Sequence, residues 1–112
     1  MDWKYLYTSF EGRIGRRDWW IGVIGLFLIS VVATILFGTD GLVPFVISVL
    51  IFIGGLACHV KRFHDRGRSG WWSLIILIPF IGIIWAIVDL GILEGQPSEN
   101  AWGPPPTPRP IS

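Results

Sequence analysis

Two adjacent residues, His64 and Asp65, have the side chains best suited to chemistry, and Arg62 and Arg68 lie close on either side. A histidine beside a carboxylate is able to shuttle protons, and guanidinium groups hold phosphate. Together they would suit acid/base chemistry on a lipid headgroup. The sequence offers no nucleophile motif, metal-ligand set or second catalytic cluster to complete such a site, and a neighbouring His-Asp pair is usually part of a solvated turn. We therefore predict that the protein is not an enzyme.

Metal binding is weakly supported by the histidines. His59 and His64 are five residues apart, a spacing that does not place two side chains on one helical face. Cys58 is the single cysteine, which excludes an intramolecular disulfide and, alone, a cysteine-based metal cage. We predict no metal site and no cofactor, and expect His64 at headgroup level to hydrogen-bond a phosphate or a carboxylate.

The same residues belong to a basic stretch, 61–72, that separates two apolar runs. Four of the nine Lys and Arg residues fall within eight positions of this stretch, and Trp71 and Trp72 follow directly. Cations match the phosphates of lipid headgroups, and indoles favour the boundary between headgroups and acyl chains. This stretch is therefore expected at a membrane surface.

The composition supports a membrane protein. The chain has 112 residues, enough for one domain at most, of which 52% are hydrophobic, and its mean hydropathy is +0.60. A water-soluble domain this small could not bury so much apolar surface. The cations border the apolar runs and do not form one free basic face, which argues against nucleic-acid binding. We predict an all-α membrane protein.

Three apolar runs are expected to cross the membrane, giving a membrane domain over 19–93. The runs 19–37 and 42–60 each contain nineteen residues without a Lys, Arg, Asp or Glu, enough for about 30 Å of hydrocarbon. The third predicted transmembrane helix covers 71–93, with a kink at Pro79. Asp89 is the only acid in any run. Because it lies near the end of its run, we expect an interfacial carboxylate; the alternative is a proton or ion pathway.

The two ends of the chain are predicted to lie outside the membrane domain. In the segment 1–18, apolar residues recur every three or four positions, which is typical of an amphipathic helix in the interface. The helix is expected to end near Glu11, since Gly12 and Gly15 follow; an irregular leader is the alternative. Residues 94–112 form a polar, Pro-rich tail whose second half is expected to be extended.

Charge counting predicts the orientation. Residues 1–18 and 61–70 each contain four Lys or Arg, and the turn between the first two runs contains none, so both basic segments are expected in the cytoplasm. Two matching cassettes, Arg16-x-x-Trp19-Trp20 and Arg68-x-x-Trp71-Trp72, are each expected to open a helix that leaves this face. Three spans then place the N-terminus in the cytoplasm and the tail on the periplasmic or extracellular side.

Three motifs carry a resemblance to a known family: Phe10-x-Gly12-Arg13-x-x-Arg16-Arg17-x-x-Trp20, Arg62-x-His64-Asp65-x-Gly67-Arg68-Ser69-Gly70-Trp71-Trp72 and Asn100-x-Trp102-Gly103-Pro104. Over about Asp2 to Pro106 the chain resembles the bacterial inner-membrane family catalogued as domain of unknown function 805. It departs by having Trp102 where an aromatic such as tyrosine is usual, Pro105 where an acidic or polar residue is common, and Phe63 where an aliphatic residue is expected. The resemblance implies a small multi-spanning plasma-membrane protein, with no established activity and no catalytic residues.

We interpret the basic and aromatic residues as a cytoplasmic collar that contacts anionic lipid headgroups or a partner protein, although topology alone would also explain the cations. The expected partners are membrane lipids and either further copies of the chain or another membrane protein. The alternative is an oligomeric channel or small transporter using Asp89, in which several copies enclose the pathway. The predicted collar consists of Arg13, Arg16, Arg17, Trp19, Trp20, Arg62, His64, Asp65, Arg66, Arg68, Trp71 and Trp72.

Overall fold

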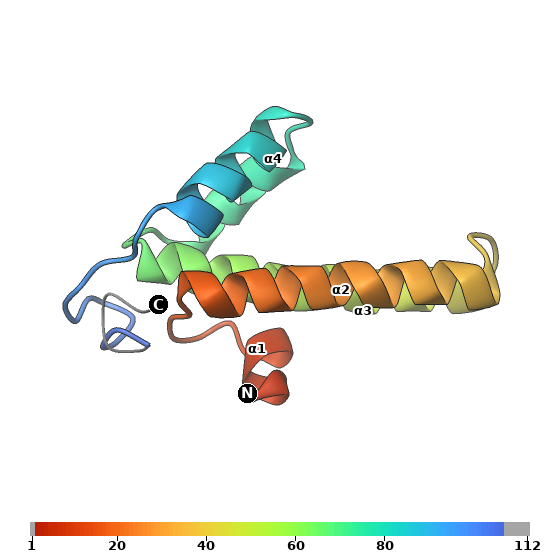
Figure 1. The fold of residues 1–112 in the computed structure, drawn as a ribbon, viewed down its shortest axis with the longest axis horizontal. Coiled ribbons are helices and arrows are strands. Elements are labelled where there is room, and N and C mark those ends of the chain that lie inside the picture. Colours follow the sequence, from red (N-terminus) through yellow and green to blue (C-terminus); the bar gives the residue numbers. More distant parts are fainter. Residues whose placement is uncertain (1, 107–112) are drawn as a thin grey trace.

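Two long antiparallel helices form the frame of the protein, whose residues 2–106 are described in a computed structural model (Figure 1). These are α2, Arg16–Phe37, and α3, Leu42–Asp65. At ~1.5 Å per residue they extend about 33 and 36 Å. Both are long and apolar enough to cross a membrane. The predicted spans 19–37 and 42–60 therefore correspond to α2 and α3.

A four-residue turn joins the two long helices at the end we call the far end. It begins at Gly38 (φ 75°) and ends at Gly41 (φ 104°), both in the left-handed region that favours glycine. The peptide N–H of Gly38 donates to the carbonyl of Thr34 and closes α2. The two glycines allow the chain to reverse within this short turn.

The third predicted helix, over 71–93 with a kink at Pro79, is not a single helix in the structure. The run is divided into a 3₁₀ helix, η1, Gly70–Leu77, a short helix, α4, Ile81–Trp85, and a π-helical segment, η2, Ala86–Ile92. Pro79 has no N–H to continue a helix, and Phe80 adopts a left-handed φ of 64°. A Cβ at Gly82 would lie 2.4 Å from the carbonyl oxygen of Ile76, so the close return requires glycine there. The result is a reversal, not a kink.

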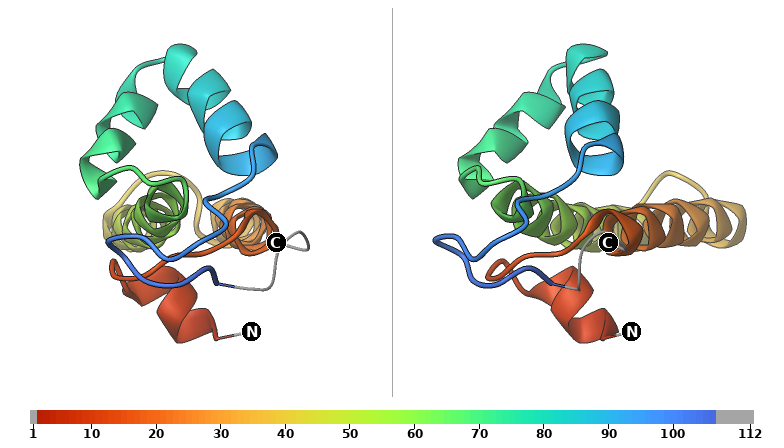
Figure 2. Two further views of the ribbon diagram at one scale, coloured as in Figure 1. Left: turned by 90° about the vertical axis from the view of Figure 1, so that its left-hand side faces the viewer. Right: turned by 60° about the vertical axis from the view of Figure 1, so that its left-hand side comes forward.

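The divided run forms a hairpin whose two arms start and finish at the same end of the α2–α3 pair (Figure 2). Eight residues of 3₁₀ helix at ~2.0 Å per residue give η1 a length of about 16 Å, half the thickness of a bilayer's hydrocarbon. This arm of the hairpin is therefore much shorter than α2 or α3. Its apolar tip is exposed, with Phe80 at 79%.

The N-terminal segment contains a helix that is shorter than the one expected. α1, Trp3–Thr8, is capped by the carboxylate of Asp2, which accepts from the N–H of Tyr5 at 3.1 Å. α1 lies on the opposite side of the α2–α3 pair from the hairpin (Figure 2). Its Leu6 is buried against Gly22 and Cys58. Part of the expected amphipathic face, Leu6 and Ile14, thus packs on protein, whereas Trp3 and Phe10 are exposed.

The tail returns across the end opposite the turn, at the start of α2 and the end of α3. The N–H of Gln96 donates to the carbonyl of Asp65 at 2.7 Å, and Asn100 and Gly103 form an isolated β-bridge. Residues 107–112, including Pro108 of the expected extended half, lie outside the described part of the chain. The described tail residues therefore contact the same end of the helix pair as the N-terminal segment.

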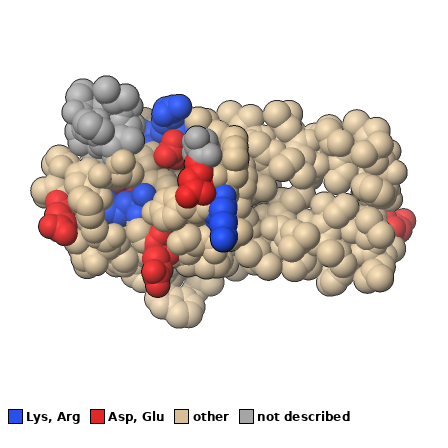
Figure 3. Space-filling model, turned by 90° about the horizontal axis from the view of Figure 1, so that it is seen from below, with Lys and Arg blue, Asp and Glu red and all other residues tan. Residues whose placement is uncertain are grey.

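We call this end, residues 12–20 and 58–66 with the segments packed on them, the base. Its buried apolar residues include Leu6, Ile14, Trp19, Phe63 and Leu90. Charged side chains gather there in Figure 3, and the far half of the helix pair is uncharged on that face until its extreme end, where the turn contains Asp40. The structure is therefore a narrow apolar pair of helices on a wide, folded base.

Candidate functional site

The centre of the base is a buried ion cluster of Arg13, Arg62 and Asp65, which we call the Asp65 cluster. Arg13 donates from Nε to Asp65 Oδ1 at 3.0 Å, with Nη2 at 2.8 Å from the same oxygen. Arg62 Nη1 lies 2.5 Å from Oδ2. All three side chains are no more than 1% exposed. Each carboxylate oxygen therefore binds one guanidinium away from solvent.

Backbone carbonyls accept hydrogen bonds from other guanidinium donors of this cluster. Arg62 reaches the end of the hairpin at 2.7 and 2.6 Å, and Arg13 reaches the tail at 2.6 to 2.9 Å. Since guanidinium presents its donors in a rigid fork, it ties several segments together at fixed angles. The accepting carbonyls belong to Leu90, Leu93, Gln96, Ser98 and Gly103.

A second cluster, the Asp89 cluster, consists of Arg66, Arg68 and Asp89. Arg66 donates to Asp89 Oδ1 from Nη2 at 3.0 Å, and Arg68 Nε lies 3.3 Å from Oδ2 as an ion pair without hydrogen-bond geometry. The guanidinium of Arg68 also lies 4.7 Å from the ring centre of Trp72. Asp89 thus lies at the base, and its ion pairs connect the hairpin to the end of α3.

Lys61 holds α1 against the base. Its ammonium donates to the carbonyls of Tyr5 and Leu6 and lies 4.2 Å from the centre of the Tyr5 ring. Tyr5 in turn donates from its hydroxyl to the Arg13 carbonyl. Burial raises the pKa of Tyr5 and that of Tyr7, so both phenols stay protonated donors at neutral pH.

The two histidines point to different partners. His64 Nδ1 is 2.9 Å from the Gly12 carbonyl, and its ring stacks on Trp102 with centroids 4.6 Å apart. His59 Nδ1 accepts from the indole N–H of Trp19 at 3.1 Å. Within residues 2–106, no group of three or more His, Cys, Asp or Glu side chains is placed to hold a metal ion. The His64–Asp65 acid/base pair is not assembled either, because the Asp65 oxygens face arginines.

Several predicted collar residues are not on the surface. Four of the side chains assigned to headgroups are buried, and Trp19 is 2% exposed. That assignment is therefore corrected for Arg13, Trp19, Arg62, His64 and Asp65, whose partners are within the protein. Asp65 pairs with Arg62, three residues before it, whereas Arg68, three residues after it, pairs with Asp89.

Other collar residues remain accessible. Trp71 is 78% exposed, and Trp20 and Trp72 are 36% and 40% exposed. Arg17 is exposed, whereas Arg16 is partly buried and donates to the carbonyl of Ile92. Both cassettes do open helices at the base, α2 at Arg16 and η1 at Gly70. The surface of the base therefore retains indoles and a smaller set of cations.

Three distant motifs of the sequence meet in the base. Arg13 from the first binds Asp65 from the second and the Gly103 carbonyl from the third. The side-chain amide of Asn100 donates to the carbonyl of His64 at 2.9 Å. Lys61 and Asn100 were not among the predicted site residues. The Asn100-x-Trp102-Gly103 motif was the feature of the sequence from which a role of the tail in this site could have been predicted.

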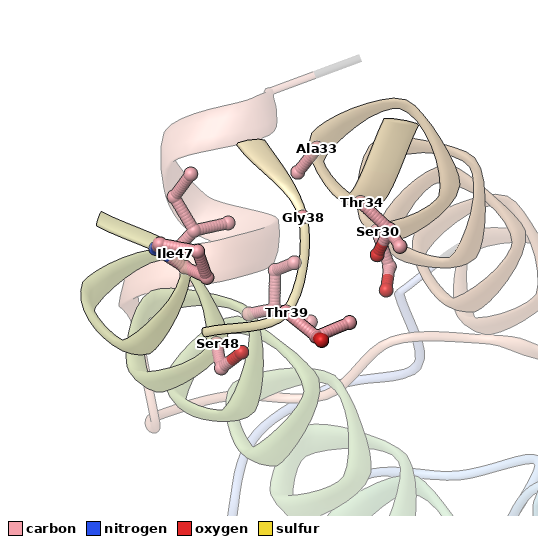
Figure 4. Close-up of a pocket in the computed structure, with 9 residues that line it drawn as sticks. Ser30, Ala33, Thr34, Gly38, Thr39, Ile47 and Ser48 are labelled. Atoms are coloured by element: carbon pink, nitrogen blue, oxygen red, sulfur yellow. The ribbon is translucent and has the colours of Figure 1, made fainter. Parts of the chain in front are cut away.

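A small crevice lies near the far turn, between α2 and α3 (Figure 4). It has a volume of about 100 Å³. Hydroxyl side chains of Ser30, Thr34, Thr39 and Ser48 are among those that line it. Small residues permit this close helix contact, and the hydroxyls make the crevice polar.

Comparison with known proteins gives consistent relatives. A family model described as Protein of unknown function (DUF805) matches residues 7–104. The chain is 35% identical to Inner membrane protein YhaH of Escherichia coli K12, over 95% of this chain and 97% of the relative. It is 30% identical to Inner membrane protein YhaI of the same strain, over 89% and 87%. No solved structure matches the chain.

Proposed function

The chain belongs to the DUF805 family, whose relatives include inner membrane proteins of Escherichia coli, and on that premise we propose a non-enzymatic, lipid-binding role in the bacterial inner membrane. In this role the base binds anionic lipid headgroups. The supporting observation is the charge of the Asp65 and Asp89 clusters. Two carboxylates, Asp65 and Asp89, face four arginines, which leaves a surplus of two positive charges. A phosphate at the edge of the base would offset that surplus.

Surface groups around the base would make the contact. Lys4 and Arg17 are exposed cations, and the exposed indoles of Trp20, Trp71 and Trp72 surround the same end. Cations at phosphate depth with indoles just below them match the composition of a membrane interface. We therefore propose a smaller collar, in which the exposed cations and indoles contact the lipid. The buried arginines contribute only to the electrostatic attraction at longer range.

The first test removes two exposed cations. The double variant Lys4→Gln/Arg17→Gln is expected to lower the preference for anionic over neutral lipid by roughly ten- to thirtyfold, since each cation near the surface contributes about 1 kcal/mol. The preference is measured as the phosphatidylglycerol-to-phosphatidylcholine ratio of lipid retained after purification from mixed vesicles in mild detergent.

The matched control keeps the charges, as Lys4→Arg/Arg17→Lys, and is expected to retain the parent preference. Exposed acids at the same end, including Glu11 and Glu99, reduce the net charge of the base, so the comparison is made between variants and not against an unrelated protein. An unchanged lipid ratio in the glutamine variant would refute headgroup binding by the base.

We also propose that both ends of the chain are cytoplasmic, with α2 and α3 as the two spans and the hairpin entering the membrane from the cytoplasmic side. Support comes from the tail, which Arg13 holds at the base. This replaces the expectation of a periplasmic or extracellular tail.

Single-cysteine labelling tests this arrangement in a Cys58→Ala background. With a membrane-impermeant thiol reagent on intact cells, the Asp40→Cys variant is expected to be labelled at the far turn. The Glu99→Cys variant is expected to be labelled only after the inner membrane is opened. Labelling of the latter in intact cells would restore a third span.

An oligomeric channel is the second candidate, favoured by the polar crevice of Figure 4 and by the uncovered apolar surface of the far half. Several copies would be required for a continuous pathway. The pairing of Asp89 with Arg66 and Arg68 does not support its use as the ion carrier in this reading.

A further inference from the structure

A groove runs between α3 and η1 and consists of two adjoining cavities. The outer cavity, about 420 Å³, opens at the base beside His64, Ser69 and Trp102. The inner cavity, about 280 Å³, continues among apolar side chains such as Phe52 and Leu77. Leu56, Ser73 and Leu74 line both. The groove therefore leads from the polar base toward the apolar half of the protein.

The groove contains a buried hydroxyl that has no partner. Ser73 is 6% exposed, and its Oγ has no hydrogen-bond partner among the described residues. A hydroxyl in apolar surroundings without a hydrogen bond is costly. Ser73 therefore requires an acceptor that the described part of the chain does not provide.

His59 provides a second donor in the inner cavity. Its Nδ1 accepts the indole proton of Trp19, and an indole nitrogen is only a donor. The neutral ring consequently carries its own proton on Nε2. Two hydrogen-bond donors, Ser73 O–H and His59 Nε2–H, thus belong to one apolar cavity. Such a cavity favours a ligand that is mostly apolar and has a hydrogen-bond acceptor beside these two residues.

The position along α3 identifies the kind of acceptor. His59 is five residues from His64, or about 7.5 Å of helix rise toward the far end. The headgroup region of each leaflet is roughly 5–8 Å thick, so the boundary with the acyl chains lies at about that depth. The acceptors that a bilayer presents there are the ester carbonyls of its lipids.

We propose that this groove binds one acyl chain of a diacyl glycerophospholipid, whose ester carbonyl accepts from Ser73 and His59. The chain occupies the inner cavity, and the phosphate lies at the mouth beside Ser69. The hydroxyl of Ser69 accepts from the N–H of Trp71, which leaves its proton available to donate. The inference rests on the proposed function only in placing the base at headgroup level.

The test compares two lipids that differ only in the linkage. Diacyl phosphatidylglycerol and its dialkyl ether analogue share headgroup and chain length, but the ether lacks the carbonyl. Retention of each lipid by the purified full chain is measured by native mass spectrometry. The parent protein is expected to retain the diacyl form at least about tenfold better, the change expected for loss of one or two hydrogen bonds.

The Ser73→Ala variant is expected to lose most of this discrimination, whereas Ser30→Ala, in the distant crevice, is expected to keep it. Because Ser73→Ala removes an unpaired hydroxyl, its thermal stability without lipid should equal or exceed that of the parent, which separates lost recognition from misfolding. Equal retention of the two lipids by the parent, or discrimination that survives Ser73→Ala, would overturn the proposal. The preference for an anionic headgroup is measured separately with the Lys4 and Arg17 variants. The acyl-chain site and headgroup binding by the base are therefore tested independently of each other.

Discussion

Replacing Asp65 with asparagine is expected to destabilise the protein by about 3–5 kcal/mol, the typical cost of removing one partner from a buried ion pair. Among residues 2–106, Asp65 is the carboxylate that pairs with both Arg13 and Arg62, and its side chain is fully buried. Without it, two guanidiniums face each other away from water. They would release the carbonyls of the tail and the hairpin in order to reach solvent.

The single cysteine provides the measurement. Cys58 is fully buried, so a thiol-reactive dye reports unfolding during a denaturant titration in mild detergent. The control Glu99→Gln alters an exposed carboxylate of the tail and is expected to change stability by less than about 0.5 kcal/mol. If Asp65→Asn resembled this control, the Asp65 cluster would not organise the base.

A double variant sharpens this test. Arg13→Gln should cost less in the Asp65→Asn protein than in the parent, because the charge it removes is then unpaired. Contacting charged residues typically show coupling of about 0.5–3 kcal/mol in such cycles. Additive costs would mean that Arg13 and Asp65 do not depend on each other.

Replacing Asp89 with asparagine is expected to cost less, about 1–2 kcal/mol, and to loosen the hairpin in particular. The arginines of the Asp89 cluster are partly exposed, with side-chain values of 20% and 32%, so solvent screens part of the lost attraction. Arg66 and Arg68 would then repel each other at the junction of α3 and η1. Hydrogen exchange is expected to increase over 86–92 more than over α2.

The exposed neighbour Glu94 supplies the control, as Glu94→Gln, for which exchange over 86–92 is expected to stay at the parent rate. The same pair of variants separates the two proposed functions. Proton or ion flux in liposomes that disappears only with Asp89→Asn, while hairpin exchange stays unchanged, would favour the channel over the lipid-binding protein.

The two long helices follow from local features of the sequence. Residues 19–37 and 42–60 are apolar, long enough to span, and separated by a glycine-bounded turn, so length and hydropathy suffice to predict α2 and α3. The segregation of cations likewise predicted that one end would be charged. These properties depend on neighbouring residues in the chain and need no knowledge of tertiary contacts.

The hairpin and the clusters could not be predicted in this way. The run 71–93 has enough residues for a transmembrane helix, so its length gives no sign of a reversal. The reversal depends on the left-handed φ of Phe80 and on the space that Gly82 leaves for the Ile76 carbonyl. Only that reversal brings Asp89 back to Arg66 and Arg68. The burial of Arg13 similarly requires carbonyls from a tail whose polar, proline-rich composition signals no docking.

The four-residue turn at the far end has a consequence for which molecules could reach the protein. In the proposed arrangement, with the base in the cytoplasm, the turn bounded by Gly38 and Gly41 would be the one segment of residues 2–106 to emerge on the opposite side of the membrane. Such a short turn leaves almost no surface on that side for an extracellular messenger, antibody or protease to bind. Any regulatory molecule would then have to bind from the cytoplasm or from within the lipid bilayer.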